Sequence, residues 1–117
     1  MSYALLIVEP AGQRQTRTEA EGRAVYDRML RFSEDLKSRG LLTLTQSLKT
    51  DSQGARVRVQ DNQSTVVDGP FAEAKEMIGG FFILTCATRA QAIALAKECP
   101  AAQWATVEVR ELGPCFT

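Results

Sequence analysis

The chain has 117 residues, with 14 basic and 14 acidic side chains. This length suits one domain with one hydrophobic core, so we expect a single domain over residues 1–117. The balanced charge and the lack of a basic stripe argue against a nucleic-acid partner. No apolar run approaches the roughly 20 residues of a membrane helix, so we expect no membrane partner. The opening MSYALLIVEP lacks the basic region and cleavage site of a signal peptide, which favours a cytoplasmic location.

Histidine is absent from the sequence, which limits the chemistry open to the chain. Histidine-dependent triads and histidine-ligated metal sites are excluded. The cysteines Cys86, Cys99 and Cys115 match no zinc or redox spacing, and their odd number argues against a disulfide framework. We expect Cys86 and Cys99 to be core residues and Cys115 to be exposed. The sequence predicts no metal and no cofactor, and acid–base chemistry would have to use carboxylates, Lys, Tyr or Cys.

An apolar strand is predicted at the start of the chain, over residues 3–8. Both alternating sets of its side chains are apolar, which is typical of a strand covered on both faces. Pro10-Ala11-Gly12 ends this strand. The polar residues 13–18 that follow predict a mobile loop.

A long amphipathic helix is predicted next. Thr18 and Glu21 have the spacing of a capping box, and Thr16 with Glu19 is an equal alternative start. Gly40 supplies the C-terminal stop. The residues that recur at helical spacing form one apolar stripe, made of Val25, Met29, Phe32 and Leu36.

A strand with one polar face and a β-hairpin are predicted in the middle of the chain. Residues 42–48 alternate leucine with polar residues, and residues 51–54 form a turn. The hairpin arms are residues 55–60 and 64–68, joined by Asp61-Asn62-Gln63. Arg56 and Arg58 lie on one side of the first arm.

The last third repeats the strand–helix–strand order. Residues 79–87 predict a strand that is apolar on both faces. Thr88 and Gln91 predict the start of a helix that ends before Pro100. A final strand is predicted over residues 104–112, opened by Trp104.

This order, β-α-β, then a hairpin, then β-α-β, predicts an α+β fold of the ferredoxin-like type. Two helices cover only one face of a four-stranded sheet. The strands at residues 3–8 and 79–87 are nevertheless apolar on both faces, so one apolar face lacks a cover. A second copy of the chain is its simplest cover, and we expect a homodimer.

The segment DGPFAEAKE, residues 68–76, is the strongest candidate for a site. It places Asp68 at the end of a strand, just before a turn-forming Gly69-Pro70 pair. On a purely structural interpretation, the Asp68 carboxylate accepts backbone N–H groups of the turn, and Phe71 anchors the loop in the core. The charged residues then form a solvated surface.

On a functional interpretation, the turn presents Asp68 and Glu73 to a pocket as a pair of carboxylates. Two carboxylates in unlike surroundings can act as acid and base, so Asp68 and Glu73 are the catalytic candidates. An anionic ligand would meet nearby cations. The candidate ligand-binding residues are Asp68, Gly69, Pro70, Phe71, Glu73, Lys75, Glu76, Arg56 and Arg58.

The same nine-residue segment, followed by glycines and an aromatic strand, resembles the signature of the DGPF-type branch of the YCII-related proteins. The resemblance implies a dimeric α/β barrel of ferredoxin-like subunits. It also implies a histidine–aspartate site in the broader family, which this chain lacks because it has no histidine. Association of the branch with sigma factors implies, as an alternative to ligand binding, a regulatory module in transcription.

Overall fold

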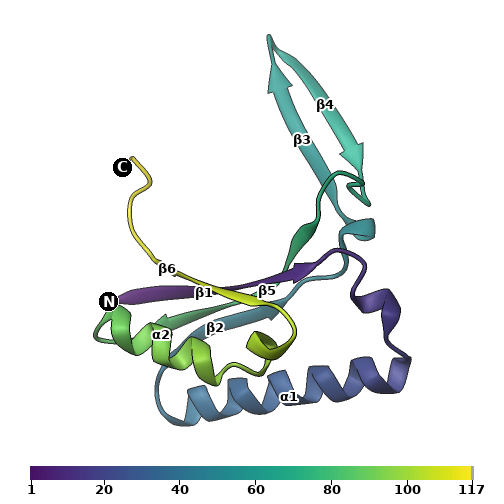
Figure 1. Cartoon of the computed structure of the whole chain (residues 1–117). Helices are drawn as coiled ribbons and strands as arrows, with labels where there is room; N and C mark the ends of the chain where they lie inside the picture. The colour runs from purple at the N-terminus through teal and green to yellow at the C-terminus, as the bar shows by residue number, and fades with distance from the viewer. Residues whose placement is uncertain (117) are drawn as a thin grey trace.

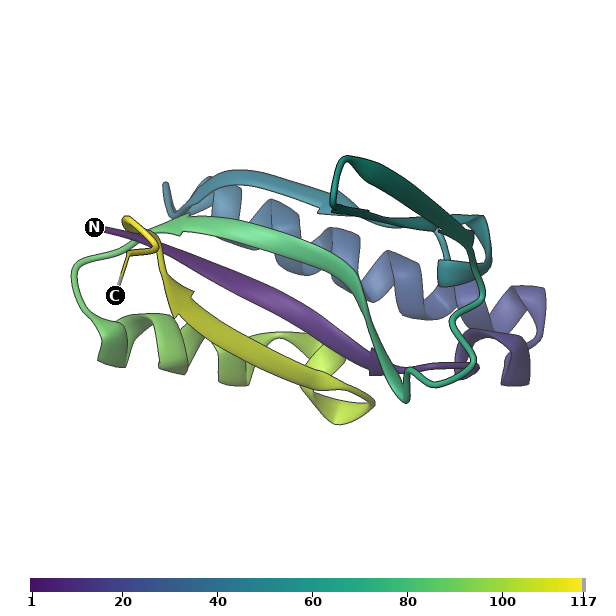
Figure 2. The same cartoon turned by 90° about the horizontal axis from the view of Figure 1, so that it is seen from above.

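The computed structural model describes residues 1–116 and has an α+β, ferredoxin-like fold (Figure 1). Its four-stranded antiparallel sheet has the order β2-β5-β1-β6. The strands are β1 (Ser2–Pro10), β2 (Leu42–Ser47), β5 (Glu76–Thr85) and β6 (Thr106–Glu111). Helices α1 (Glu19–Ser38) and α2 (Arg89–Glu98) lie side by side on one face of this sheet (Figure 2). The predicted fold class is therefore confirmed.

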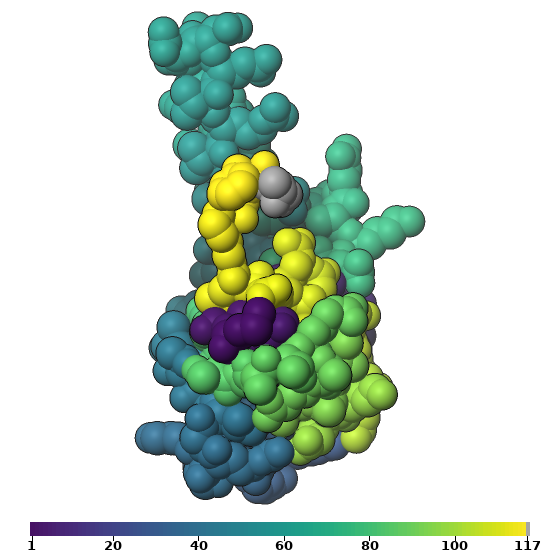
Figure 3. Space-filling view, turned by 90° about the vertical axis from the view of Figure 1, so that its left-hand side faces the viewer, coloured from purple at the N-terminus to yellow at the C-terminus, as the bar shows by residue number. Residues whose placement is uncertain are grey.

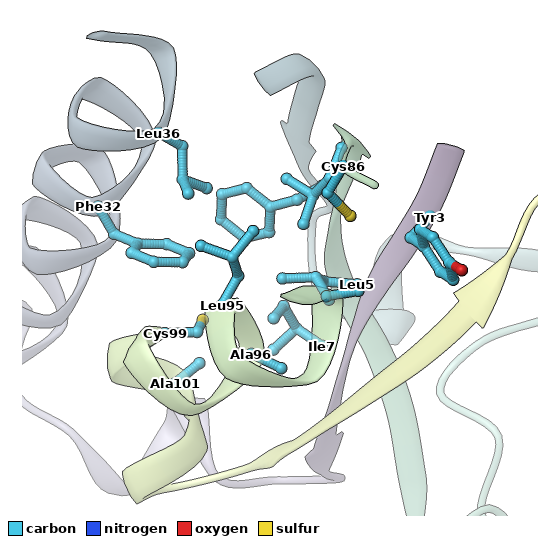
Figure 4. Close-up of a cluster of buried hydrophobic side chains, with 13 residues drawn as sticks. Tyr3, Leu5, Ile7, Phe32, Leu36, Cys86, Leu95, Ala96, Cys99 and Ala101 are labelled. Carbon is cyan, nitrogen blue, oxygen red and sulfur yellow. The ribbon is translucent and has the colours of Figure 1, made fainter. Parts of the chain in front are cut away.

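The hydrophobic core lies between these helices and the sheet (Figure 4). Leu5 and Leu84 come from the two central strands, and Leu36 and Leu95 from the helices. Phe32 of α1 meets Phe82 of β5 edge to face, with ring centroids 5.4 Å apart. The core also takes in the two predicted cysteines, while Cys115 is exposed and all three thiols are free.

Both helices begin at the threonines that the sequence indicates. The hydroxyl of Thr18 accepts the N–H of Glu21, and the Glu21 carboxylate accepts the N–H of Thr18, which completes a capping box. The alternative start at Thr16 is thus wrong. Thr88 caps α2 in the same way, although the side chain of Gln91 accepts from Ala87 instead of from Thr88.

Two further local predictions are wrong. The segment after β1 is not a loose loop, because Arg14–Thr16 forms a 3₁₀ helix tied to the sheet by side-chain contacts of Arg14. Trp104 does not open the last strand either. It follows the short 3₁₀ helix Pro100–Gln103, and β6 begins two residues later, at Thr106.

The second face of the sheet has no helix over it (Figure 1). Leu6 and Phe81 pair across β1 and β5 and are half-buried there. Leu44 of β2 and Ile78 of β5 are 46% and 48% exposed. The centre of this face is therefore apolar and open, as the alternation of apolar residues predicts, while Glu108 and Arg110 of β6 make its edge charged.

The predicted hairpin forms an arm that stands away from the sheet. Strands β3 (Ala55–Gln60) and β4 (Gln63–Asp68) pair with each other alone, and every residue of both is exposed. Asp61 and Asn62 have φ of 53° and 63°, the left-handed angles of a tight two-residue turn. The arm rises on the side of the sheet that faces away from the helices (Figures 1 and 3).

Candidate functional site

The segment 68–76 joins β4 of the arm to β5 of the sheet, and its backbone is tightly held. The N–H of Gly69 donates to the carbonyl of Gly54 at 2.8 Å, and the Gly69-Pro70 peptide is cis. A Cβ at residue 69 would lie 1.8 Å from the carbonyl oxygen of Asp51, so only glycine fits there. Gly69 therefore allows the two ends of the arm to meet.

Phe71 and the next residues secure the base of the arm. The Arg56 guanidinium of β3 lies over the Phe71 ring at 4.0 Å from its centroid. Ala74 donates its N–H to the carbonyl of Phe71, and the carbonyl of Lys75 accepts the N–H of Ala11. Phe71 is half-buried and lies outside the hydrophobic core, so the prediction that it anchors the loop in the core is wrong. It packs on the arm instead, and both the glycine and the phenylalanine of the motif thus have structural roles in this subunit.

The charged side chains of the motif behave differently. Asp68, Glu73, Lys75 and Glu76 are all exposed, and among residues 1–116 their side chains make no hydrogen bond and no ion pair. The predicted capping role of Asp68 is therefore wrong. Arg58 is also exposed, on the arm. The structure brings Arg56 and Phe71 together but leaves the carboxylates exposed and without a bonding partner among the described residues, so their roles in binding or catalysis stay predictions.

A second polar cluster, which the sequence did not reveal, lies at the end of β1. Glu9 is only 6% exposed, and it is the one buried charged residue in the described chain. The Arg14 guanidinium donates two hydrogen bonds to the Glu9 carboxylate in a bidentate ion pair, with N–O distances of 3.0 Å and 2.7 Å. Arg14 also donates to the carbonyls of Leu48 and Gly79, at 2.9 Å and 3.3 Å.

Gly79 is the residue that makes room for this cluster. Ile7 pairs with Gly80 and Val8 with Ile78, so Gly79 is the extra residue of a β-bulge. A Cβ on Gly79 would lie 1.6 Å from Oε1 of Glu9. The bulge therefore brings bare backbone against the carboxylate, which a side chain would displace.

The cluster borders a cavity of about 730 Å³ between the N-terminal half of α1 and the sheet. Apolar side chains from α1 and from the sheet line its interior, among them Val25, Met29, Ile7 and Phe82. Trp104 contributes to its wall, and the guanidiniums of Arg17 and Arg28 lie over that ring. A smaller hollow of about 350 Å³ shares Arg14 and Lys49 with it.

One sequence signal could have pointed to Glu9. Tyr3, Leu5, Ile7 and Glu9 alternate along one face of the first strand, so Glu9 follows three apolar residues on the face that the helices cover. A carboxylate at such a position needs a cationic partner. The partner Arg14 lies in a segment whose polar composition suggested a loop.

Residues 1–115 match the family model of the YCII-related domain. The chain belongs to this family. It is also similar to an uncharacterised protein of Rhizobium meliloti (strain 1021), with 28% identity over 115 residues, or 97% of this chain and 93% of that one.

In this YCII-related chain, no three Cys, Asp or Glu side chains among residues 1–116 gather closely enough to hold a metal ion together. No helix in the same range is long and apolar enough to cross a membrane. The polar groups that could contribute to a site are the exposed carboxylates at the base of the arm and the Glu9–Arg14 ion pair beside the α1 cavity.

Proposed function

We propose that this protein is a homodimer that binds a small molecule in a cleft beside residues 68–76, which the second subunit completes. The observation that carries the proposal is the open apolar centre of the sheet face, next to an arm whose two strands pair only with each other and are exposed along their whole length. A second copy covers such a face with the same apolar residues, as a two-fold interface requires.

The arm supports the same proposal on energetic grounds. A two-stranded hairpin is marginally stable in water unless it packs on something. In the subunit, Val57, Val59, Val66 and Val67 of the arm are each more than half exposed. The arm and the C-terminal residues 113–116 rise on the same side of the sheet, at opposite ends of the open face (Figure 1). This shape leaves space for a partner subunit between them.

A partner in this position would change the surroundings of the motif carboxylates. In the single subunit, the side chains of Asp68 and Glu73 are exposed to solvent. Covered on one side by a second subunit, they would line a polar cleft together with Lys75 and the arginines of the arm. In such a cleft, carboxylates can bind a cationic or hydroxylated ligand or transfer a proton.

Light scattering tests the assembly. Wild type should have twice the chain mass of 12.9 kDa. Ile83→Glu places a charge in the middle of the open face and should give a folded monomer, whereas Ala94→Glu, on the exposed side of α2, should leave the dimer intact. A wild-type monomer, or a dimer that survives Ile83→Glu, would contradict the proposed interface.

Carbodiimide labelling, mapped by mass spectrometry, tests the cleft. Asp68 and Glu73 should be protected in the wild-type dimer and reactive in the Ile83→Glu monomer. The exposed Asp27 of α1 should react equally in both and serves as the internal control. Equal reactivity of Asp68 in the two forms would show that the partner does not enclose the motif.

A second function, a regulatory module that binds another protein, is favoured by one observation. The exposed valines occupy both faces of the arm, since Val57 pairs with Val66 while Val67 pairs with Arg56. A heterologous protein could bind them as well as a second copy can. A wild-type monomer in light scattering would favour this alternative.

A further inference from the structure

The cavity between α1 and the sheet lies on the helical side of the molecule, away from the proposed dimer interface, and it has the attributes of a separate ligand site. Its volume of about 730 Å³ falls within the range of about 300–1,000 Å³ that is usual for small-molecule pockets. We propose that it binds an amphiphilic anion, a small molecule with an apolar alkyl or aryl body and one anionic head group. This proposal does not depend on the homodimer.

The interior selects for an apolar body. Val25 and Met29 of α1 face Ile7 and Phe82 of the sheet across the cavity, and none of these side chains carries a polar atom that needs a partner. Apolar surface of this kind is stabilised by an occupant that removes it from water.

The charges around the cavity select for an anion. Four cations and two carboxylates line it, and both carboxylates are already paired, Glu9 with Arg14 and Glu19 with Arg23. Among residues 1–116, Lys49 has no carboxylate partner. Arg17 interacts with Glu21 only at a distance, since hydrogen bonds at the N-cap of α1 lower the pKa of Glu21 most and the charge of Arg17 adds to this. Their positive charge, next to an apolar interior, complements an anionic head attached to an apolar body.

Gly22 gives independent support. Glycine is a poor helix former compared with alanine, yet it is the fourth residue of α1, at the wall of the cavity. A Cβ there would meet no atom within 4 Å. No packing contact in the subunit requires glycine at this position, and its effect is to keep the cavity open at the wall.

Trp104 allows a direct assay, since it is the chain's one tryptophan and lines the cavity. We suggest titrating the full chain with sodium octanoate, followed by tryptophan fluorescence and by calorimetry. Octylammonium tests the sign of the charge, and acetate tests the head group alone. Octanoate should give a saturable signal, octylammonium should bind at least about fivefold more weakly, and acetate should give no saturable signal.

Three variants distinguish octanoate binding in the cavity from binding elsewhere on the surface. Gly22→Leu should fill the cavity and abolish octanoate binding without lowering Tm, because leucine favours the helix. Ala24→Leu places the same side chain on the solvent side of α1 and should bind as wild type does. Lys49→Gln should weaken binding about two- to fivefold, and added salt should reduce that difference.

Several outcomes would overturn the proposal. No saturable signal up to roughly 10 mM octanoate would do so, because burial of its alkyl chain should give tighter binding than that. Equal binding of octanoate and octylammonium would remove the argument from charge. Undiminished binding by Gly22→Leu would place the ligand elsewhere, such as on the open face of the sheet.

Discussion

The close approach of β5 to Glu9 predicts an unusual response to a small substitution, Gly79→Ala. The new methyl group would lie 1.6 Å from Oε1 of Glu9 and 2.7 Å from a guanidinium nitrogen of Arg14. Real contacts of this kind lie beyond 3 Å, so the carboxylate must move. Glu9 is buried, and the move separates it from Arg14.

The expected magnitude follows from two opposing effects. Alanine in place of glycine inside a strand stabilises by about 0.5–1 kcal/mol when the space is free. Breaking a buried ion pair costs about 3–5 kcal/mol, and the lower end applies because the Arg14 side chain is 31% exposed and can turn towards water. Gly79→Ala should therefore destabilise the fold by about 2–3 kcal/mol.

A double-mutant cycle tests this explanation. In a Glu9→Ala background no carboxylate is present to clash, so Gly79→Ala should be close to neutral, and the two substitutions should couple by about 2 kcal/mol. Urea unfolding at one fixed protein concentration measures all four chains, since an assembling chain gains stability with concentration. Additivity within about 0.5 kcal/mol would refute the idea that Gly79 is needed because of Glu9.

Three further predictions concern the core, the thiols and the start of α1. Phe32→Ala should cost about 3–5 kcal/mol in urea unfolding because it leaves a cavity under α1, and a loss below about 1 kcal/mol would mean that this side chain does not hold the helix. Burial raises the pKa of the Cys86 and Cys99 thiols, so a thiol reagent at about pH 7.5 should label Cys115 fast and the other two slowly, and equal rates would contradict the packing. The backbone N–H of Thr18 donates to the Glu21 carboxylate and lowers the pKa of Glu21 in the folded protein. The negative charge of Glu21 therefore stabilises the fold fully at pH values above the unfolded pKa of about 4.3. This stabilisation is lost as the pH falls through the lower pKa of the folded state. The difference in Tm between wild type and Glu21→Gln should therefore shrink as the pH is lowered through this range. A difference that stays constant with pH would refute this effect of charge.

The fold could be predicted from sequence because its signals are local and agree with one another. The capping threonines, the stripe on α1 and the Asp61-Asn62 turn each depend on neighbours in the chain. The order of the helices and strands along the chain then favours one topology. Two βαβ units with short connections pair their strands into a sheet of the observed order, β2-β5-β1-β6.

The polar clusters could not be predicted in the same way. Glu9 and Arg14 are near in sequence, but their pairing depends on a bulge at Gly79 and on the carbonyl of Leu48, which arrive from distant strands. The α1 cavity depends on how far the helix stands from the sheet, which no periodicity reveals. The prediction of a mobile loop at residues 13–18 was wrong for the same reason, because tertiary contacts hold this segment in an ordered structure.

The motif at residues 68–76 shows how one conspicuous segment can combine two kinds of constraint. Gly69 and Phe71 are accounted for within the subunit, by the approach to Asp51 and the contact with Arg56. Asp68 and Glu73 are not accounted for in this way, because their exposed side chains make no hydrogen bond and no ion pair among residues 1–116. Substituting an exposed, unbonded carboxylate should change stability by no more than about 0.5 kcal/mol. Any requirement for these two carboxylates must therefore come from outside the subunit, from a partner or a ligand, and the homodimer proposed above provides the nearest source of both.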